Sequence, residues 1–448
     1  MAVTVQALVQ AECCDEQVDQ VLQVLAKEMN DLGLKNSDKL CSPVKILHTS
    51  QERKMQQKPP GVPFFTKQNH HLYTEDTLIW DSKLIEKCKL STLNGPKVRK
   101  LIKEGLIQRK FLLPQYPIRF IFHTMMSTTD ENMCYQAYNS LCYLLQSTNV
   151  RGMRLRLDFY LALGNLGADL SKVGQDLSKL KHPMIPSSPD HQDIPDIALT
   201  PTQLRDKLKL VLQLFSTILA DPNNSTDSSG LAKPDVIMED LDELIMTFIA
   251  LGLDPKVVET NLDHHIANCI TNCLNLYPSH LQFCKRVQEL VERISTYCNF
   301  DPHNVAHVCC QFLLPTPQGC ILRASLAFVQ LQICLNVEKK TVLDIVKLND
   351  VTKLVEERLS FIKERDGYTI YFIIKLLDCC VYMEYEDVLS DAEKLELKSL
   401  EQILESVFTN IRDNVDDLNL TVVRFYSVRV LEKWKRKRWF DGDDTASI

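Results

Sequence analysis

Residues Thr369 to Met383 read TIYFIIKLLDCCVYM and are apolar on almost every side when they are wound as a helix. The exceptions are Thr369, Lys375 and Asp378, and the last two lie three residues apart, so they share a helix face and can pair. A helix that is hydrophobic all round belongs inside a protein or a membrane. With 15 residues it is too short for a bilayer of about 30 Å, which needs about 20 residues. We therefore expect a central buried helix with amphipathic helices before and after it.

Helix-start signals recur on the N-terminal and C-terminal sides of this segment. The capping box Thr200-Pro201-Thr202-Gln203 begins one strongly amphipathic helix, and a second box, Ser390 to Glu393, begins another. Asp254-Pro255 and Asp301-Pro302 mark two more starts. No stretch alternates like a strand, and no fixed repeat period is found. The sequence predicts an all-α fold, an irregular, solenoid-like multi-helix array with no sheet.

Stretches rich in proline and small polar residues divide the chain. Residues 182–201 carry five prolines and no helical period, which is typical of a linker or a long surface loop. Residues 221–234, DPNNSTDSSGLAKP, predict a disordered loop, and residues 51–70 are polar, marked by prolines and expected to be irregular. We expect an N-terminal helical region over 1–181 and a C-terminal one over 202–448, and the two halves can also form one continuous helical body.

Composition bounds the class of protein. The 448 residues are 45% hydrophobic and 24% charged, as in an ordinary globular protein, and the net charge of −7 argues against a surface that binds nucleic acid everywhere. The 16 cysteines include no C-x-x-C spacing and lie inside apolar helical runs. Because we find neither a signal peptide nor a membrane span, we expect buried free thiols in a reducing, intracellular compartment.

Two clusters combine histidine and cysteine at helical spacing, and neither predicts a metal site. One is His265, Cys269 and Cys273, and the other is His303, His307 and Cys310. The first three residues follow one another along a helix face, so they cannot all reach a single tetrahedral zinc ion. The second cluster converges better, but it lacks H-E-x-x-H and a clear fourth ligand. Packed helix faces are the simpler interpretation, and we expect no metal.

Motifs of catalysis and nucleotide binding are missing from the sequence. It contains no G-x-S-x-G elbow, no G-x-x-x-x-G-K-[ST] loop and no G-x-G-x-x-G turn. Acidic groups such as Asp240, Asp242 and Glu243 are interpreted as solvated faces or as charges that favour a helix start. We therefore expect a protein that is not an enzyme and that holds no cofactor.

The C-terminal segment KWKRKRW interleaves five cations with two tryptophans. Its residues are Lys433, Trp434, Lys435, Arg436, Lys437, Arg438 and Trp439. Such a segment can serve as a nuclear-import signal, or it can contact nucleic acid through phosphates and stacked bases. It can equally be the last turns of a helix, with cations near the negative end of the dipole and tryptophans packed on the core. The sequence leaves these three interpretations open.

A second basic stretch lies on and just after a helix predicted to begin at Pro96. Its cations are Lys97, Arg99, Lys100, Lys103, Arg109 and Lys110. A solvated helix face explains them, and a docking surface for acidic groups or DNA is the alternative.

Three parts of the chain carry a resemblance that extends as a general pattern over nearly its whole length. They are FLLPQYPIRFIFHTMM (111–126), RLRLDFYLALGNLGADL (154–170) and the C-terminal helices. Together they resemble the Nse-five-like helical domain of the SUMO-interacting-motif-containing protein. That domain is in turn similar to the C-terminal half of the localisation factors that recruit the cohesin-related Smc five-six complex.

The resemblance implies a nuclear, non-enzymatic helical scaffold of genome maintenance and the SUMO pathway, with no membrane association. Its implied partner is an Nse-six-like localisation-factor subunit, and the heterodimer would bring the Smc five-six complex to chromatin, foreign DNA or nuclear bodies. One departure is that Val236-Ile237-Met238 before Glu239-Asp240 matches a SUMO-interacting motif poorly. SUMO binding would then lie outside this chain. The alternative hypothesis is a helical adaptor that contacts nucleic acid through the C-terminal basic and tryptophan cluster.

Overall fold

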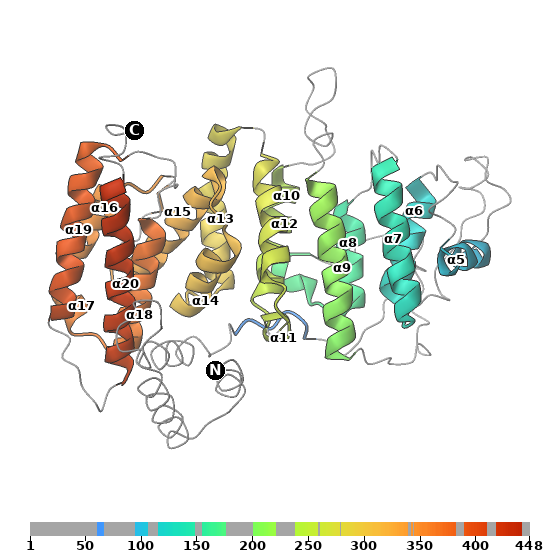
Figure 1. Ribbon diagram of the computed structural model, residues 1–448, viewed down its shortest axis with the longest axis horizontal. Helices are drawn as coiled ribbons and strands as arrows, with labels where there is room; N and C mark the ends of the chain where they lie inside the picture. Colours follow the sequence, from blue (N-terminus) through green and yellow to red (C-terminus); the bar gives the residue numbers. More distant parts are fainter. Residues whose placement is uncertain are drawn as a thin grey trace, which may run out of the picture. The chain divides into compact units, whose positions relative to one another are not determined.

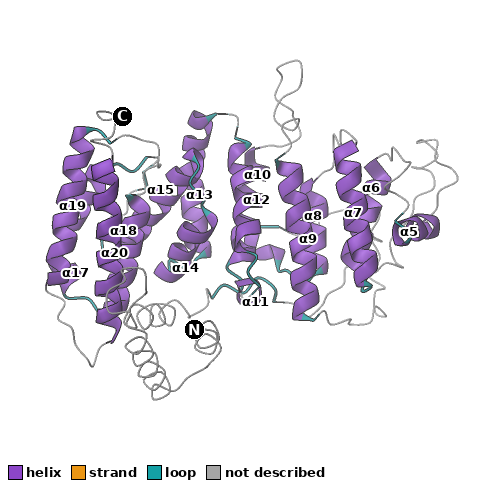
Figure 2. Ribbon diagram, in the orientation of Figure 1, coloured by secondary structure: helices purple, strands orange, loops and turns teal. Residues whose placement is uncertain are grey.

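The computed structural model describes most of the chain between residues 61 and 440. The described ranges are 61–66, 95–105, 115–147, 155–175, 200–220, 238–258, 260–277, 279–338, 342–343, 345–381, 389–409 and 418–440. Within them every regular element is a helix and none is a strand (Figure 2), which confirms the all-α prediction. None of these helices is both long and apolar enough to cross a membrane.

The described helices belong to two compact units. The larger unit comes from Pro59–Leu359 and Phe372–Leu400, and the smaller unit includes Ser360–Tyr371 and the helical residues from Glu401 onward. The predicted linker over 182–201 lies outside the described residues except for Thr200 and Pro201, as does the whole of the predicted loop over 221–234. The domain boundary expected there stays a prediction.

Most of the helices lie in the larger unit. In its first part they are α5 (Gly95–Lys103), α6 (Gln115–Ser127), α7 (Glu131–Ser147), α8 (Leu155–Asn165), the 3₁₀ turn η2 (Leu170–Val173), α9 (Pro201–Leu219) and α10 (Met238–Gly252). They continue as α11 (Pro255–Val258), α12 (Asp263–Asn275), α13 (His280–Tyr297), α14 (Pro302–His307), the π-helical turn η6 (Val308–Phe312), α15 (Pro317–Cys334) and α16 (Leu348–Glu357). Within this unit α6 packs on α7, α7 on α9, α9 on α12, α12 on α10, and α10 on α13, as a multi-helix array (Figure 1).

The remaining helices are α17 (Leu359–Lys363), α18 (Gly367–Cys380), α19 (Asp391–Thr409) and α20 (Leu418–Phe440). The division between the units falls within α17, α18 and α19. Helix α18 is the segment predicted to be buried on every side, and its residues Ile370 to Ile374 are all nearly inaccessible to solvent. That prediction is confirmed.

The predicted helix starts are also confirmed. The Thr200 hydroxyl accepts a hydrogen bond from the Gln203 N–H at 3.2 Å, and the Thr200 N–H donates to the Gln203 side-chain oxygen at 3.1 Å. Ser390 and Glu393 make the same reciprocal contact at the start of α19. These bonds satisfy amide groups that the first helical turn leaves without intrahelical partners.

Candidate interaction surfaces

The C-terminal basic segment lies on α20 in the smaller unit, where part of it packs against α19. The indole of Trp434 is 3% exposed, so its ring faces protein. Lys435 Nζ lies 2.6 Å from Glu405 Oε1, and Arg438 Nη2 lies 2.8 Å from Glu401 Oε2. Burial raises the pKa of Glu401, and the charge of Arg438 opposes that shift. Lys435 and Arg438 therefore join α20 to α19, and Trp434 is buried beside them on α20.

Other cations of the same segment lie on the surface. Lys433 and Arg436 are exposed and Lys437 is half-buried, whereas the side chain of Trp439 lies outside the described residues. A base can stack only on an exposed ring, so Trp434 does not offer a stacking platform. Import and nucleic-acid contact stay predictions for the remaining cations, with Lys433 and Arg436 as the accessible ones.

A shallow groove runs between α19 and α20 in the smaller unit. It encloses about 440 Å³ and is lined by Glu405, Thr409, Arg424, Val428, Leu431, Glu432 and Lys435. Val428 is 47% exposed, while Leu431 beside it is buried. The groove thus combines one exposed apolar side chain, Val428, with charged side chains of both signs, and such a combination can contribute to a contact with another protein.

Helix α5 carries the second basic stretch. Lys97, Lys100 and Lys103 are exposed, and the buried face of the helix is formed by Val98 and Ile102. Arg99 does not share the exposed face, since its guanidinium lies 5.8 Å from the centroid of the Phe120 ring. Arg109 and Lys110 lie outside the described residues. The structure thus brings three of the six predicted cations onto one helix face.

In the two histidine and cysteine clusters Cys269, Cys273 and His303 are buried, whereas His265 and His307 are half-buried and Cys310 is exposed. The Cys269 thiol donates to the Leu212 carbonyl at 3.3 Å, and burial raises the pKa of both Cys269 and Cys273. The His303 ring lies 5.3 Å, centroid to centroid, from Phe372. Among the residues that the structure describes, no three histidine, cysteine or acidic side chains are grouped so as to hold a metal.

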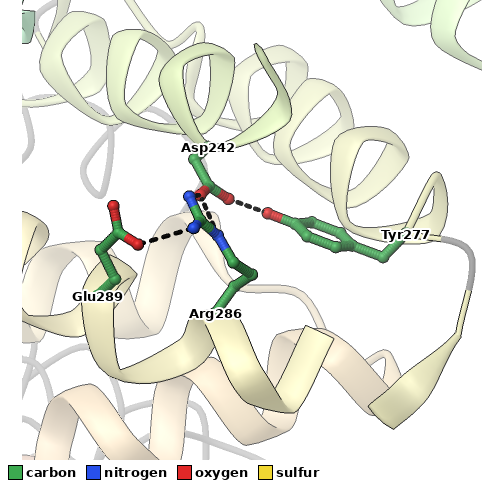
Figure 3. Close-up of polar contacts among 4 residues, drawn as sticks. All are labelled: Asp242, Tyr277, Arg286 and Glu289. Atoms are coloured by element: carbon green, nitrogen blue, oxygen red, sulfur yellow. Dashed lines mark hydrogen bonds and ion pairs between the residues drawn. The ribbon is translucent and has the colours of Figure 1, made fainter. Parts of the chain in front are cut away.

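Asp242 was expected on a solvated face or among helix-start charges, and the first of these interpretations is wrong. Its carboxylate is completely buried between α10 and α13 (Figure 3). It accepts hydrogen bonds from the Tyr277 hydroxyl and from Arg286, whose Nε lies 2.9 Å from Oδ2. Arg286 Nη1 also pairs with Glu289 at 2.8 Å. Burial raises the pKa of Tyr277, and the carboxylate raises the pKa of Arg286, so the phenol stays neutral and the guanidinium charged.

This buried cluster of Asp242, Tyr277 and Arg286 fixes the packing of α10 against α13. Both residues that bind the carboxylate lie outside α10: Tyr277 follows the end of α12, and Arg286 lies on α13. A buried carboxylate is tolerated only where charged or polar donors replace its lost hydration. The arrangement therefore stabilises the orientation of α10 relative to α13.

Comparison with known proteins adds no identification. A scan against protein-family models and a search of curated proteins both found no match to this chain.

Proposed function

We propose that this chain is a non-catalytic helical scaffold that forms a heterodimer with an Nse-six-like localisation-factor subunit. The heterodimer would recruit the Smc five-six complex to chromatin, foreign DNA or nuclear bodies, and the chain would act in the nucleus. Two considerations support the proposal: the resemblance of residues 111–126 and 154–170, and an all-α array whose helix faces suit protein contacts.

The observation that carries the proposal is the groove between α19 and α20. Val428 exposes an apolar side chain in it, and Arg424 and Glu432 lie on its rim. Burying apolar surface supplies affinity, while rim charges select the partner and its orientation. A partner helix with one apolar face and charges of complementary sign fits this chemistry.

Val428→Asp tests the proposal in a binding titration between the purified chain and the partner subunit. A buried unpaired charge at the contact should weaken binding at least tenfold. Leu281→Asp is the matched control, because Leu281 is also an exposed apolar residue but lies on α13 in the larger unit. Equal binding by all three proteins would remove the groove from the interface, and no complex with the wild-type chain would remove the proposed function.

A nucleic-acid-contacting adaptor is the second candidate, and the exposed cations of α5 and α20 favour it. The sharpest variant is Lys433→Gln with Arg436→Gln, since both residues are exposed on α20. A DNA-binding chain should show an affinity that falls steeply with salt, and this variant should lower the slope by about 2. An unchanged slope would exclude these two cations from a phosphate contact.

A further inference from the structure

Residues 61–66, GVPFFT, form an extended segment that lies along the larger unit beside α11 (Figure 1). The segment belongs to the region that the sequence predicted to be irregular, and it has no regular secondary structure. Its burial was not expected from the sequence. Phe64 and Phe65 are 0% and 4% exposed, and Val62 is also buried, whereas Gly61, Pro63 and Thr66 face solvent.

Backbone N–H groups of the segment are bound by side chains distant in sequence. Asp254 Oδ2 accepts from the N–H of Phe64 and from that of Phe65, the latter at 2.8 Å. Asn304 Oδ1 accepts from the Gly61 N–H at 3.2 Å. Both acceptors are themselves buried. Because carboxylate acceptors form bonds about twice as strong as neutral ones, Asp254 is the main anchor.

Three backbone carbonyls of the segment also accept hydrogen bonds from distant residues. The Pro63 carbonyl accepts from Lys172 Nζ at 2.6 Å. The Phe64 carbonyl accepts from the Asp169 N–H at 2.8 Å, and the Phe65 carbonyl accepts from Lys256 Nζ at 3.1 Å. Five residues from η2 and its flanks, the end of α10, α11 and α14 therefore surround one short strip of backbone. Main-chain recognition combined with pockets for chosen side chains is the way proteins bind extended peptides.

These contacts define which peptides the binding site of residues 61–66 can accept. The two N–H groups read by Asp254 must come from consecutive non-proline residues, and both of their aromatic side chains are enclosed. Proline fits at position 63, because only its carbonyl is bound there. The buried positions require uncharged side chains, because an enclosed charge would lose its hydration, and an acidic one would also be repelled by the Asp254 carboxylate.

We propose that the binding site of residues 61–66 is a docking site for an extended peptide with two consecutive aromatic residues and no charge at its buried positions. Residues 61–66 occupy the site in cis, and a segment of the same chemistry from another protein competes for it. Residues 61–66 are part of the chain, so their effective concentration at the site is high. A competing peptide therefore binds tightly only when residues 61–66 are displaced. The inference does not depend on the proposed scaffold function.

A fluorescently labelled peptide of residues 59–68, PPGVPFFTKQ, tests this site in polarisation titrations against the full chain. The Phe64→Ala, Phe65→Ala chain should bind the peptide at least tenfold more tightly than the wild-type chain does. Adding Asp254→Asn should weaken binding at least tenfold, since the amide keeps the shape but loses the charge. A control peptide with both phenylalanines replaced by alanine should not bind.

Circular dichroism establishes whether the double variant folds. The proposal is overturned if the double variant folds but does not bind the peptide. It is also overturned if Asp254→Asn leaves the affinity for the peptide unchanged. If the double variant does not fold, hydrogen exchange of the wild-type chain decides instead. Exchange of the Phe64 and Phe65 amides at denaturant concentrations where α10 and α13 stay protected would support a detachable peptide. Exchange of these amides only together with those helices would make the segment a permanent part of the core and end the proposal.

Discussion

Replacing Asp242 by alanine should lower the free energy of unfolding of the larger unit by about 3–5 kcal/mol. The carboxylate is fully buried and binds both the Tyr277 hydroxyl and the Arg286 guanidinium (Figure 3). Its removal leaves the buried Tyr277 hydroxyl without its acceptor, and leaves the half-buried Arg286 paired with Glu289. The loss is larger than the net worth of the ion pair, because a buried hydroxyl and a partly buried guanidinium both lose the carboxylate that replaced their hydration.

Smaller changes in the same cluster should rank below this one. Tyr277→Phe deletes one hydrogen bond to a charged group, at a cost of about 1.5–3 kcal/mol. Glu289→Ala is the matched control, since that carboxylate also pairs with Arg286 but is about half exposed, at 51%. An exposed ion pair contributes roughly 0–1 kcal/mol. The expected order of destabilisation is therefore Asp242→Ala, then Tyr277→Phe, then Glu289→Ala.

Thermal unfolding followed by near-UV circular dichroism measures this order. At roughly 2 °C per kcal/mol for a unit of this size, Asp242→Ala should lower the Tm by about 5–10 °C, and Glu289→Ala by less than about 2 °C. Far-UV spectra at 20 °C check that each variant still forms helices. A Tm for Asp242→Ala within about 2 °C of wild type would refute the reasoning, and so would an equal effect of Glu289→Ala.

Three further changes have expected outcomes. Burial, aided by the charge of Lys375, lowers the pKa of His307 from 6.5 to about 4, so only the unfolded state binds this proton between those values. The contribution of neutral His307 to the free energy of unfolding is therefore fully present above pH 6.5, and up to about 3 kcal/mol of it is lost as the pH drops through 4. Urea titrations at pH 7.5 and 4.5 should show this loss in the wild-type chain and a smaller loss in His307→Leu. Gly252→Ala places a methyl group on the Phe312 ring and should cost about 1–3 kcal/mol in urea unfolding, with partial recovery when Phe312→Leu is added. Trp434→Ala should cost about 3–5 kcal/mol in thermal unfolding, whereas Trp434→Phe should cost less and leave any DNA affinity unchanged.

Local patterns predicted the helical architecture well. The capping residues at Thr200 and Ser390 act within three residues of themselves, so the sequence contains the whole interaction. The burial of α18 was predictable for a related reason: a helix that is apolar on all sides has no face suited to water. Both signals depend on neighbours in sequence and need no knowledge of the tertiary fold.

Interactions between distant residues were not predictable in this way. An acidic residue near the start of α10 favours the helix dipole wherever it points, and the partners of Asp242 lie 35 and 44 positions away. The KWKRKRW segment was ambiguous for the same reason. On α20 Trp434 is buried, and Arg438 binds a carboxylate of α19 that lies 37 positions away. The alternation of cations and aromatics in this segment does not indicate that Glu401 will bind one of its cations.

Helix α10 connects the two unexpected carboxylates of the larger unit. Asp242 lies in its first half and holds α13, while Asp254 follows its last turn and holds residues 61–66. Twelve residues of helical rise would separate them by about 18 Å, which is beyond the range at which substitutions usually couple. Loss of Asp242 should therefore report on helix packing and leave the bound segment in place, whereas loss of the Asp254 charge should act on that segment and on the start of α11, where Asp254 Oδ1 accepts from the Lys256 N–H. Because the two sites act independently, a chain weakened at Asp242 can still hold its Phe-Phe segment, and release of that segment need not loosen the array that presents the site.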